Sequence, residues 1–316
     1  MQRGNKIFWS NCMLIIASAI WGSCFLFQKL AATQIGAFSF MACRSFLGML
    51  TLLIIIGYTQ RGRAARETDE TMPYQFDKKY FKRLFLIAPL CGVINVMGSV
   101  LVQAGLTYTT ASKAGFLNAI YIIFVPVIGL LFKKKTGPRI LWGIVLAVIG
   151  LYNLCVTGSV TSIQKGDLII LGSTLLFALH IQLISKYVQE FVGLHFSCVE
   201  FGFASIFCGI IAIFGEHITL AQVLGCGLNI LYAGVLGIGV CYALQVTAQK
   251  YTDPTVAALL MSLESVFSAI CGVVFLKERF TLKEFIGILF IIAAIIVAQL
   301  PKREKTLTKK RYRIKI

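Results

Sequence analysis

The residue of this sequence best suited to chemistry is Glu264, a carboxylate ten residues into an apolar stretch at 254–276. At a rise of about 1.5 Å per helical residue it lies about 15 Å deep, near the middle of a bilayer. A charged side chain there costs roughly 2.5–3.5 kcal/mol on insertion scales, so such residues mark functional sites. Glu264 is therefore a candidate proton carrier or cation site, and the alternative is a protonated or hydrogen-bonded structural glutamate.

Two further charges lie well away from the ends of their apolar stretches, Arg44 in 37–57 and Glu200 in 193–214. Arg44 either has a structural or gating role, through backbone carbonyls or a nearby carboxylate, or binds a substrate carboxylate, because a guanidinium group matches a carboxylate with two hydrogen bonds. The predicted depths of Arg44 and Glu200 differ by about 10 Å, so a direct salt bridge requires a tilted or kinked helix. The sequence assigns no role to Glu200.

The other polar and aromatic side chains in these stretches each have two interpretations. His180, in 167–187, either takes part in a pH-linked step, since an unperturbed histidine titrates at pH ~6.5, or is a packed, hydrogen-bonded residue. Side chains that either line a wet cavity or hydrogen-bond between helices are Asn95, Gln103, Asn118, Gln182 and Gln245. Aromatic side chains that could stack on an aromatic or amphipathic substrate, or simply face lipid, are Trp21, Tyr108, Tyr121, Tyr242 and Phe124.

Small residues and one proline indicate how the helices pack. Pro126, in the middle of 111–132, predicts a kink that frees a backbone carbonyl and acts either as a hinge or in static packing. Pairs at the four-residue spacing that permits close helix approach are Gly115–Ala119, Gly143–Ala147 and Gly239–Ala243.

These residues must be positioned by ten apolar stretches of 18 to 25 residues that follow one another almost without a break. The stretches are 8–32, 37–57, 84–107, 111–132, 139–156, 167–187, 193–214, 225–248, 254–276 and 282–300. About 20 apolar residues span a bilayer as a helix, whereas the strands of a membrane barrel are about ten residues long and alternate. We therefore predict an all-α integral membrane protein with ten transmembrane helices, which agrees with a composition of 58% hydrophobic and 14% charged residues.

The net charge of +17 is distributed unevenly. Lys and Arg are concentrated in the basic loop 58–83, in 133–139 and in the tail 300–316. Because successive spans cross the membrane in opposite directions, these three segments lie on the same side of it. This positive-inside pattern predicts a multi-pass protein of the cell membrane with residues 1–7 and the tail, and so both termini, in the cytoplasm. We expect the tail to lie at anionic lipid headgroups, and the same distribution argues against a nucleic-acid partner.

The second five stretches repeat the first five. A shift of 143 positions aligns residues 108–134 with the second half and places Tyr121 on Glu264. We infer two repeats, 8–156 and 166–299, and because five crossings are an odd number the second repeat is inverted relative to the first. Tyr121 and Glu264 then flank the pseudo-twofold centre, where transporter sites lie, and we expect a water-accessible cavity beside them.

Several segments of both halves carry a family resemblance. They are SAIWGSCFLFQKL, FMACRSFLG and LTYTTASKAGFLNAIYIIFVPVIGLLF in the first half, and AQKYTDPTVAALLMSLESVFSAICGVVFLKERFTLKEFIGI in the second. Through them the chain resembles the EamA-type ten-helix permeases of the drug/metabolite transporter superfamily. The resemblance implies a basket of two inverted five-helix repeats, with spans 1–4 and 6–9 around a central cavity and spans 5 and 10 at the periphery.

The resemblance also bears on single residues. It matches Arg44 to an arginine usual in the second span of the family, and Glu264 to a common glutamate. At the end of the fourth span of each half, the family often has an acidic residue followed by a basic one. The second half of this chain has such a pair, Glu278 and Arg279, whereas the first half reads FKKKTGPR, so a symmetric role for the pair is in doubt.

We predict a secondary transporter that moves a small polar or amphipathic metabolite by alternating access around a midplane cavity. The resemblance implies export of an amino acid or a derivative, with protons as the coupling ion if the carrier is an antiporter. One alternative is a carrier of a cationic drug, a nucleotide sugar or a sugar phosphate, and phosphate would need basic side chains such as Arg44 and Lys29 at the cavity. Outside transporters, the alternatives are a channel or a scaffold.

Other chemistry is not expected. The sequence has no H-E-x-x-H, G-x-S-x-G or Walker motif, so we expect neither an enzyme nor an intrinsic ATPase. The ten cysteines show no metal-ligand spacing, so we expect no metal and no cofactor. The oligomeric state stays open.

Overall fold

The computed structural model describes residues 3–64, 77–109, 111–134, 136–155, 165–276 and 282–299, and within these ranges every regular element is a helix. The first half contains α1 (Arg3–Ala31), α2 (Ala37–Ala64), α3 (Lys78–Leu106), α4 (Ala111–Ala119), α5 (Tyr121–Leu131) and α6 (Pro138–Cys155). The second half contains α7 (Lys165–Tyr187), α8 (Gly193–Phe214), α9 (Leu220–Gly225), α10 (Gly227–Gly234), the π-helix η1 (Val235–Val240), α11 (Cys241–Gln249), α12 (Pro254–Met261), α13 (Glu264–Leu276) and α14 (Leu282–Gln299).

The helices begin and end close to the predicted stretches. Eight segments of the described chain are long and apolar enough to cross a bilayer, and α6 and α14 contain shorter apolar stretches. The basic loop predicted at 58–83 is shorter than expected, because α2 continues to Ala64 and α3 already begins at Lys78. The middle of that loop, 65–76, and the tail 300–316 lie outside the described residues, and so does the predicted lipid contact of the tail.

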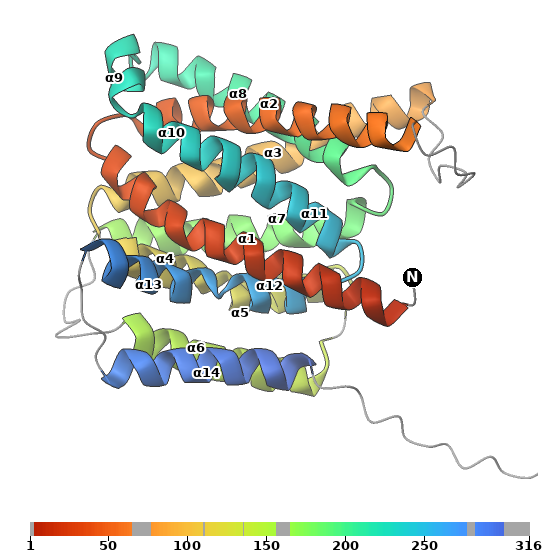
Figure 1. The fold of residues 1–316 in the computed structure, drawn as a ribbon, viewed down its shortest axis with the longest axis vertical. Coiled ribbons are helices and arrows are strands. Elements are labelled where there is room, and N and C mark those ends of the chain that lie inside the picture. Colours follow the sequence, from red (N-terminus) through yellow and green to blue (C-terminus); the bar gives the residue numbers. More distant parts are fainter. Residues whose placement is uncertain are drawn as a thin grey trace, which may run out of the picture.

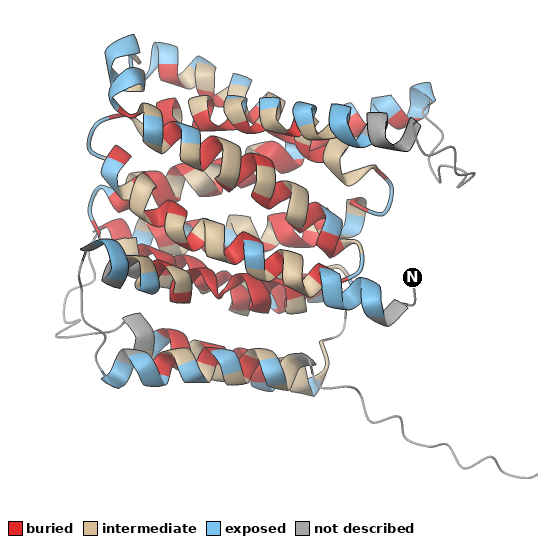
Figure 2. Cartoon of the chain, in the orientation of Figure 1, coloured by how far each residue is buried: buried red, intermediate tan, exposed pale blue. Residues whose placement is uncertain are grey.

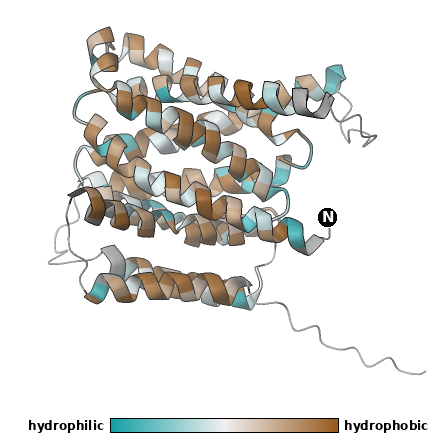
Figure 3. Cartoon of the chain, viewed as in Figure 1, coloured by the Kyte–Doolittle hydropathy of each residue, from teal (hydrophilic) through white to brown (hydrophobic). Residues whose placement is uncertain are grey.

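The long helices lie side by side, with the α6–α14 pair at one edge of the bundle and the α2–α8 pair at the other (Figure 1). The start of α1 and the end of α14 lie at the same end of the bundle. Buried residues follow the facing sides of the helices (Figure 2), whereas the outward sides remain hydrophobic (Figure 3). Outward side chains such as Ile54, Leu86 and Phe214 are strongly exposed, as expected of a surface that contacts lipid.

Two of the spans are interrupted at matching positions. Tyr121 begins α5 and Glu264 begins α13, each directly after a break in the helix. At the breaks, Ile120 N donates to a carbonyl three residues back at 3.2 Å, and Leu263 N does the same at 3.3 Å. Tyr121 and Glu264, which the shift of 143 positions pairs in the sequence, therefore hold equivalent places at the start of a half-helix.

The fourth span is interrupted, but not at its proline. Pro126 is inside α5, and the interruption falls earlier, at Ile120. The Val125 carbonyl beside the proline accepts a hydrogen bond from Gln182 Nε2 at 2.7 Å, so a neighbouring helix supports the backbone there.

Glycines bring the helices of the two halves close together. A methyl group at Gly22 of α1 would lie 2.5 Å from the carbonyl oxygen of Glu264. One at Gly239 of η1 would lie 2.5 Å from a side chain of α2, and one at Gly143 of α6 would lie 3.0 Å from a backbone oxygen of α14. At Gly115 the nearest atom would be 3.4 Å away, which is ordinary contact.

Candidate functional site

A cavity of about 80 Å³ lies where the two halves of the chain meet, and this is room for several water molecules. Its wall comes from α1 to α5 in the first half and from α7, α11, α12 and α13 in the second. The cavity expected beside Tyr121 and Glu264 is thus present. Residues considered in the sequence analysis that line it are Trp21, Arg44, Asn118, Tyr121, His180, Tyr242, Gln245 and Glu264.

Glu264 presents a buried carboxyl group at the cavity wall. It is 4% exposed, and Asn118 Nδ2 in α4 donates to its Oε1 at 2.9 Å, which joins the two halves of the chain. Among the described residues, no Lys, Arg or His side chain forms an ion pair with this carboxyl. It can therefore exchange a proton or meet a cationic group of a ligand.

Arg44 presents a buried guanidinium group to the same cavity. It is 6% exposed, and its Nη1 donates to Gln28 Oε1 at 3.0 Å. Gln103 Nε2 donates to the backbone carbonyl of Gln28 at 3.0 Å and so holds this partner from behind. Arg44 Nε has no hydrogen-bond partner, and no carboxylate of the described chain pairs with the guanidinium. A buried cation with neutral partners leaves its charge for an anionic ligand to neutralise.

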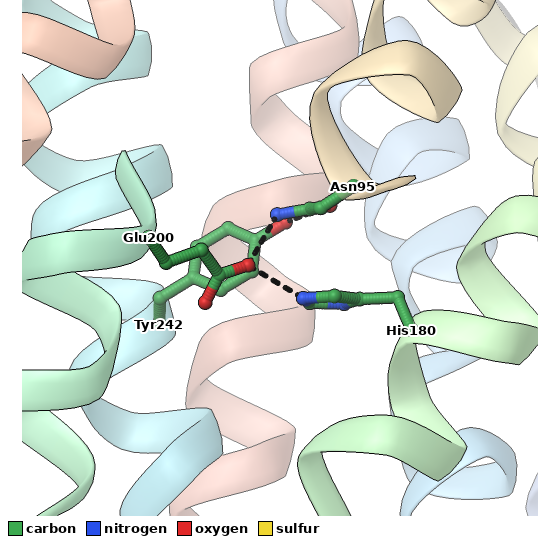
Figure 4. Close-up of polar contacts among 4 residues, drawn as sticks. All are labelled: Asn95, His180, Glu200 and Tyr242. Atoms are coloured by element: carbon green, nitrogen blue, oxygen red, sulfur yellow. Dashed lines mark hydrogen bonds and ion pairs between the residues drawn. The ribbon is translucent and has the colours of Figure 1, made fainter. Parts of the chain in front are cut away.

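A second buried polar group, His180 and Glu200, adjoins the cavity (Figure 4). His180 Nε2 lies 2.6 Å from Glu200 Oε1, and the two side chains are 2% and 0% exposed. Asn95 Nδ2 also donates to Glu200 Oε1, at 3.3 Å, and Asn95 Oδ1 accepts from the Tyr242 hydroxyl at 3.0 Å. Glu200 therefore pairs with His180, and the salt bridge to Arg44 considered from the sequence is absent from the described contacts.

Aromatic rings form the part of the wall next to this network. Trp21 Nε1 donates to the Gly237 carbonyl at 2.8 Å, and its ring meets Tyr242 edge to face with centroids 5.3 Å apart. Gly237 belongs to η1, and single π-helical turns inside α-helices occur frequently at functional sites. The rings offer a flat apolar surface with hydrogen-bonding edges.

Some polar residues considered from the sequence are kept away from the cavity. Asn95 and Gln103 lie behind the wall, where they hydrogen-bond between helices as described above. Tyr108 is 52% exposed and lies outside the wall. Lys29 Nζ donates to the Leu106 carbonyl at 2.7 Å and does not line the cavity.

Sequence reasoning missed seven residues of the cavity wall, all of them uncharged. Gln28 had a usable signal, because it follows Trp21 by seven residues, which is two helical turns and the same face of α1. The missed residues are Phe25, Gln28, Ser99, Val102, Phe177, Ile181 and Met261. Within the described ranges, no cluster of three or more His, Cys, Asp or Glu side chains could hold a metal ion.

Polar contacts join the two halves at both ends of the bundle. At one end, Lys113 Nζ lies 2.6 Å from Asp167 Oδ2. At the other end, Arg83 Nη2 lies 2.7 Å from Glu190 Oε2, and Lys134 Nζ donates to Ser185 Oγ at 3.1 Å. Partial burial lowers the pKa of Lys134, because it removes water from the ammonium group.

The sequence profile of the EamA-like transporter family matches residues 8–155 and residues 164–299. The chain belongs to the EamA-like transporter family. It is accordingly a multi-span helical membrane protein of a transporter family, in agreement with the resemblance noted in the sequence.

Relatives named as transporters align with nearly the whole chain. An uncharacterized transporter of Archaeoglobus fulgidus is 27% identical over 302 residues, which are 94% of this chain and 88% of that protein. The uncharacterized transporter YetK of Bacillus subtilis is 25% identical over 303 residues, 92% of this chain and 87% of that one. A crystal structure of a protein with 14% sequence identity aligns with a TM-score of 0.68 over 92% of this chain and 96% of that one, so the two share a fold.

Proposed function

We propose that the protein is a secondary carrier that exports a small polar or amphipathic metabolite, namely an amino acid or a derivative of one. It works by alternating access of two inverted five-helix repeats around the midplane cavity. It lies in the cell membrane with both termini in the cytoplasm.

The packing of the helices supports the inverted repeats. Contacts made by helices of the first half recur when the halves are exchanged: α2 packs on α10 and η1 as α8 packs on α3, and α1 packs on α13 as α7 packs on α5. The two matching helix breaks and the two profile matches, 8–155 and 164–299, support the same division. We place the repeats at 8–156 and 166–299, as the sequence predicts.

One observation carries the choice of substrate. Arg44 and Glu264 line a single buried cavity, and neither has an ion-pair partner among the residues that the structure describes. A buried charge is stable only when it is paired, so both groups favour a ligand with the opposite charges. An α-amino acid offers a carboxylate for Arg44 and an ammonium group for Glu264, and the aromatic wall accepts its side chain.

The contacts at the two ends support alternating access. Lys113–Asp167 at one end and Arg83–Glu190 at the other each join the first half of the chain to the second. A rocking motion that opens the cavity to one side must break the contacts of that side and keep those of the other. If an ammonium group replaces the proton on Glu264, substrate and proton compete, which is the condition for antiport.

Counterflow in proteoliposomes tests the proposal. Vesicles are loaded with an unlabelled amino-acid pool, and uptake of single ¹⁴C-labelled members is followed. We expect counterflow of at least one amino acid, and a 10- to 100-fold higher half-saturating concentration in Arg44→Gln, as roughly 1.5–3 kcal/mol of charged hydrogen bonding is lost. The matched control is Arg139→Gln, which removes a basic residue that does not line the cavity.

Two results would overturn this proposal. If no amino acid shows counterflow in protein that is folded and inserted, amino acids are excluded as substrates. A carrier of cationic drugs is then the favoured hypothesis, followed by a channel or a scaffold. Equal effects of Arg44→Gln and Arg139→Gln remove the role of Arg44. A sugar-phosphate substrate gains little support, because Arg44 alone supplies a permanent positive charge to the described cavity wall.

A further inference from the structure

We propose that the His180–Glu200 pair is a proton-binding site of the carrier, separate from Glu264, and that a proton bound there strengthens the binding of a substrate carboxylate at Arg44. The inference rests on the proposed function, because it concerns the same cavity and the same substrate class.

The geometry gives the pair one route to the cavity. His180 lines the cavity wall, whereas Glu200 lies behind it and is fully buried. The 2.6 Å contact between His180 Nε2 and Glu200 Oε1 is as short as a charge-assisted hydrogen bond. The imidazole ring therefore connects Glu200 to the cavity and can carry a proton between them.

The proton exchanges at the other ring nitrogen, Nδ1 of His180. When one proton is shared by Nε2 and the carboxylate and a second proton is on Nδ1, the pair has no net charge. This holds whether the shared proton is bonded to Nε2 or to the carboxylate oxygen. Transfer of the Nδ1 proton to a cavity water forms H₃O⁺ and leaves the pair with a charge of −1. The reverse step restores the neutral pair, and no other reactant is consumed.

The surroundings of Glu200 make the energy of the site depend on the charge of its carboxyl group. Oε1 accepts from Asn95, but Oε2 is buried with no hydrogen-bond partner in the part of the chain that the structure describes. An anion with an unpaired buried oxygen is costly, so gain or loss of one proton changes the energy of the site strongly. This network is also joined to the cavity at its far end, through the Asn95 bond to the Tyr242 hydroxyl (Figure 4).

Few other titratable groups face the pair. Cys91 of α3 and Tyr242 of α11 interact electrostatically with Glu200. Arg44 of α2 also interacts electrostatically with Tyr242. Tyr121 of α5 and Glu264 of α13 complete the titratable part of the cavity wall. Among these groups Arg44 alone has a permanent positive charge.

The charge of the pair is therefore felt at Arg44. The negative charge of the deprotonated pair weakens the positive potential at the Arg44 guanidinium group. A bound proton removes that negative charge, so the guanidinium group then attracts a substrate carboxylate more strongly. Because linkage is reciprocal, carboxylate binding also favours proton uptake by the pair. Couplings of this kind typically correspond to about 5- to 150-fold in affinity, and we expect about tenfold here.

The first test uses protons as the only ligand. The chain has three histidines, so the ¹⁵N signals of His180 in histidine-labelled protein in lipid nanodiscs are assigned by their loss in His180→Gln. We expect the signals of both ring nitrogens to shift with pH, and the midpoint to change far more in Glu200→Gln than in Glu264→Gln. Constant His180 signals in folded protein, or a midpoint indifferent to Glu200→Gln, overturn the proton site.

The second test measures the half-saturating concentration for counterflow of a ¹⁴C-labelled amino acid, at equal pH on both sides of the membrane. We expect a rise of pH to increase this concentration about tenfold more in the wild-type protein than in Glu200→Gln. An equal response in both proteins overturns the link to Arg44. If no amino acid shows counterflow, the proposed substrate class fails while the NMR titration still decides the proton site.

Discussion

The close approach of α1 to the start of α13 predicts a steric effect at Gly22. A methyl group there would lie 2.5 Å from the Glu264 carbonyl oxygen and 2.6 Å from Phe267 Cβ, whereas ordinary contact begins at 3.4 Å. In Gly22→Ala the two helices must separate by roughly 1 Å, which forfeits a large part of their dispersion contacts. Overpacking of this kind costs about 1–3 kcal/mol.

The matched control is Gly209→Ala in α8, where no atom lies within 4 Å of the added methyl group. Both substitutions gain about 1 kcal/mol of helix propensity, so their difference isolates the steric cost. Unfolding by SDS in mixed micelles measures it, and we expect Gly22→Ala to be the less stable by about 1–3 kcal/mol, or 5- to 150-fold in the unfolding equilibrium. If the two variants unfold together, α1 does not contact the backbone at Glu264 and the reasoning is refuted.

Three further predictions concern single contacts. Glu216 accepts from the backbone N–H groups of Phe38 and Ser39 at 3.0 and 2.7 Å, so we expect Glu216→Gln to destabilise the start of α2 by about 1.5–3 kcal/mol in the same SDS assay, and an unchanged midpoint would contradict it. Glu264→Gln should leave the protein folded but abolish transport driven by a pH gradient, and retention of gradient-driven uptake in vesicles would exclude Glu264 as the coupling group. Gln28→Leu removes the acceptor that orients Arg44 Nη1, so the half-saturating concentration in counterflow should rise about 3- to 10-fold, in contrast to no change for the exposed Gln34→Leu.

Much of the fold was accessible from the sequence because lipid imposes a simple rule on it. Every membrane-spanning backbone must satisfy its own hydrogen bonds, so apolar length alone locates helices such as α7 and α8 to within a few residues. The helix breaks were not accessible, since Ile120 and Leu263 are ordinary apolar residues whose local bonding depends on tertiary contacts. Pro126 predicts a kink, but the interruption of this span falls six residues earlier, at Ile120.

Some features of the candidate site could be predicted from the sequence and others could not. Buried charges such as Glu264 and Arg44 stand out in an apolar sequence, and both lie at the cavity. The partners of Glu200 could not be predicted, because depth along two helices says nothing of which faces meet. The pairing with His180 depends on how α7 and α8 rotate about their axes, which neighbouring helices decide.

The interruption of two spans gives the main chain an electrostatic role of its own. The aligned peptide dipoles of a helix place about half a positive charge at its amino end. The half-helices α5 and α13 both begin at the cavity wall, with Tyr121 and Glu264 as their first residues. The preceding half-helices α4 and α12 end at the same two breaks and place the opposite partial charge there, so the backbone presents dipoles of both signs at the cavity wall. A ligand that carries both a positive and a negative group meets these main-chain dipoles in addition to the side chains, and no side-chain substitution removes them.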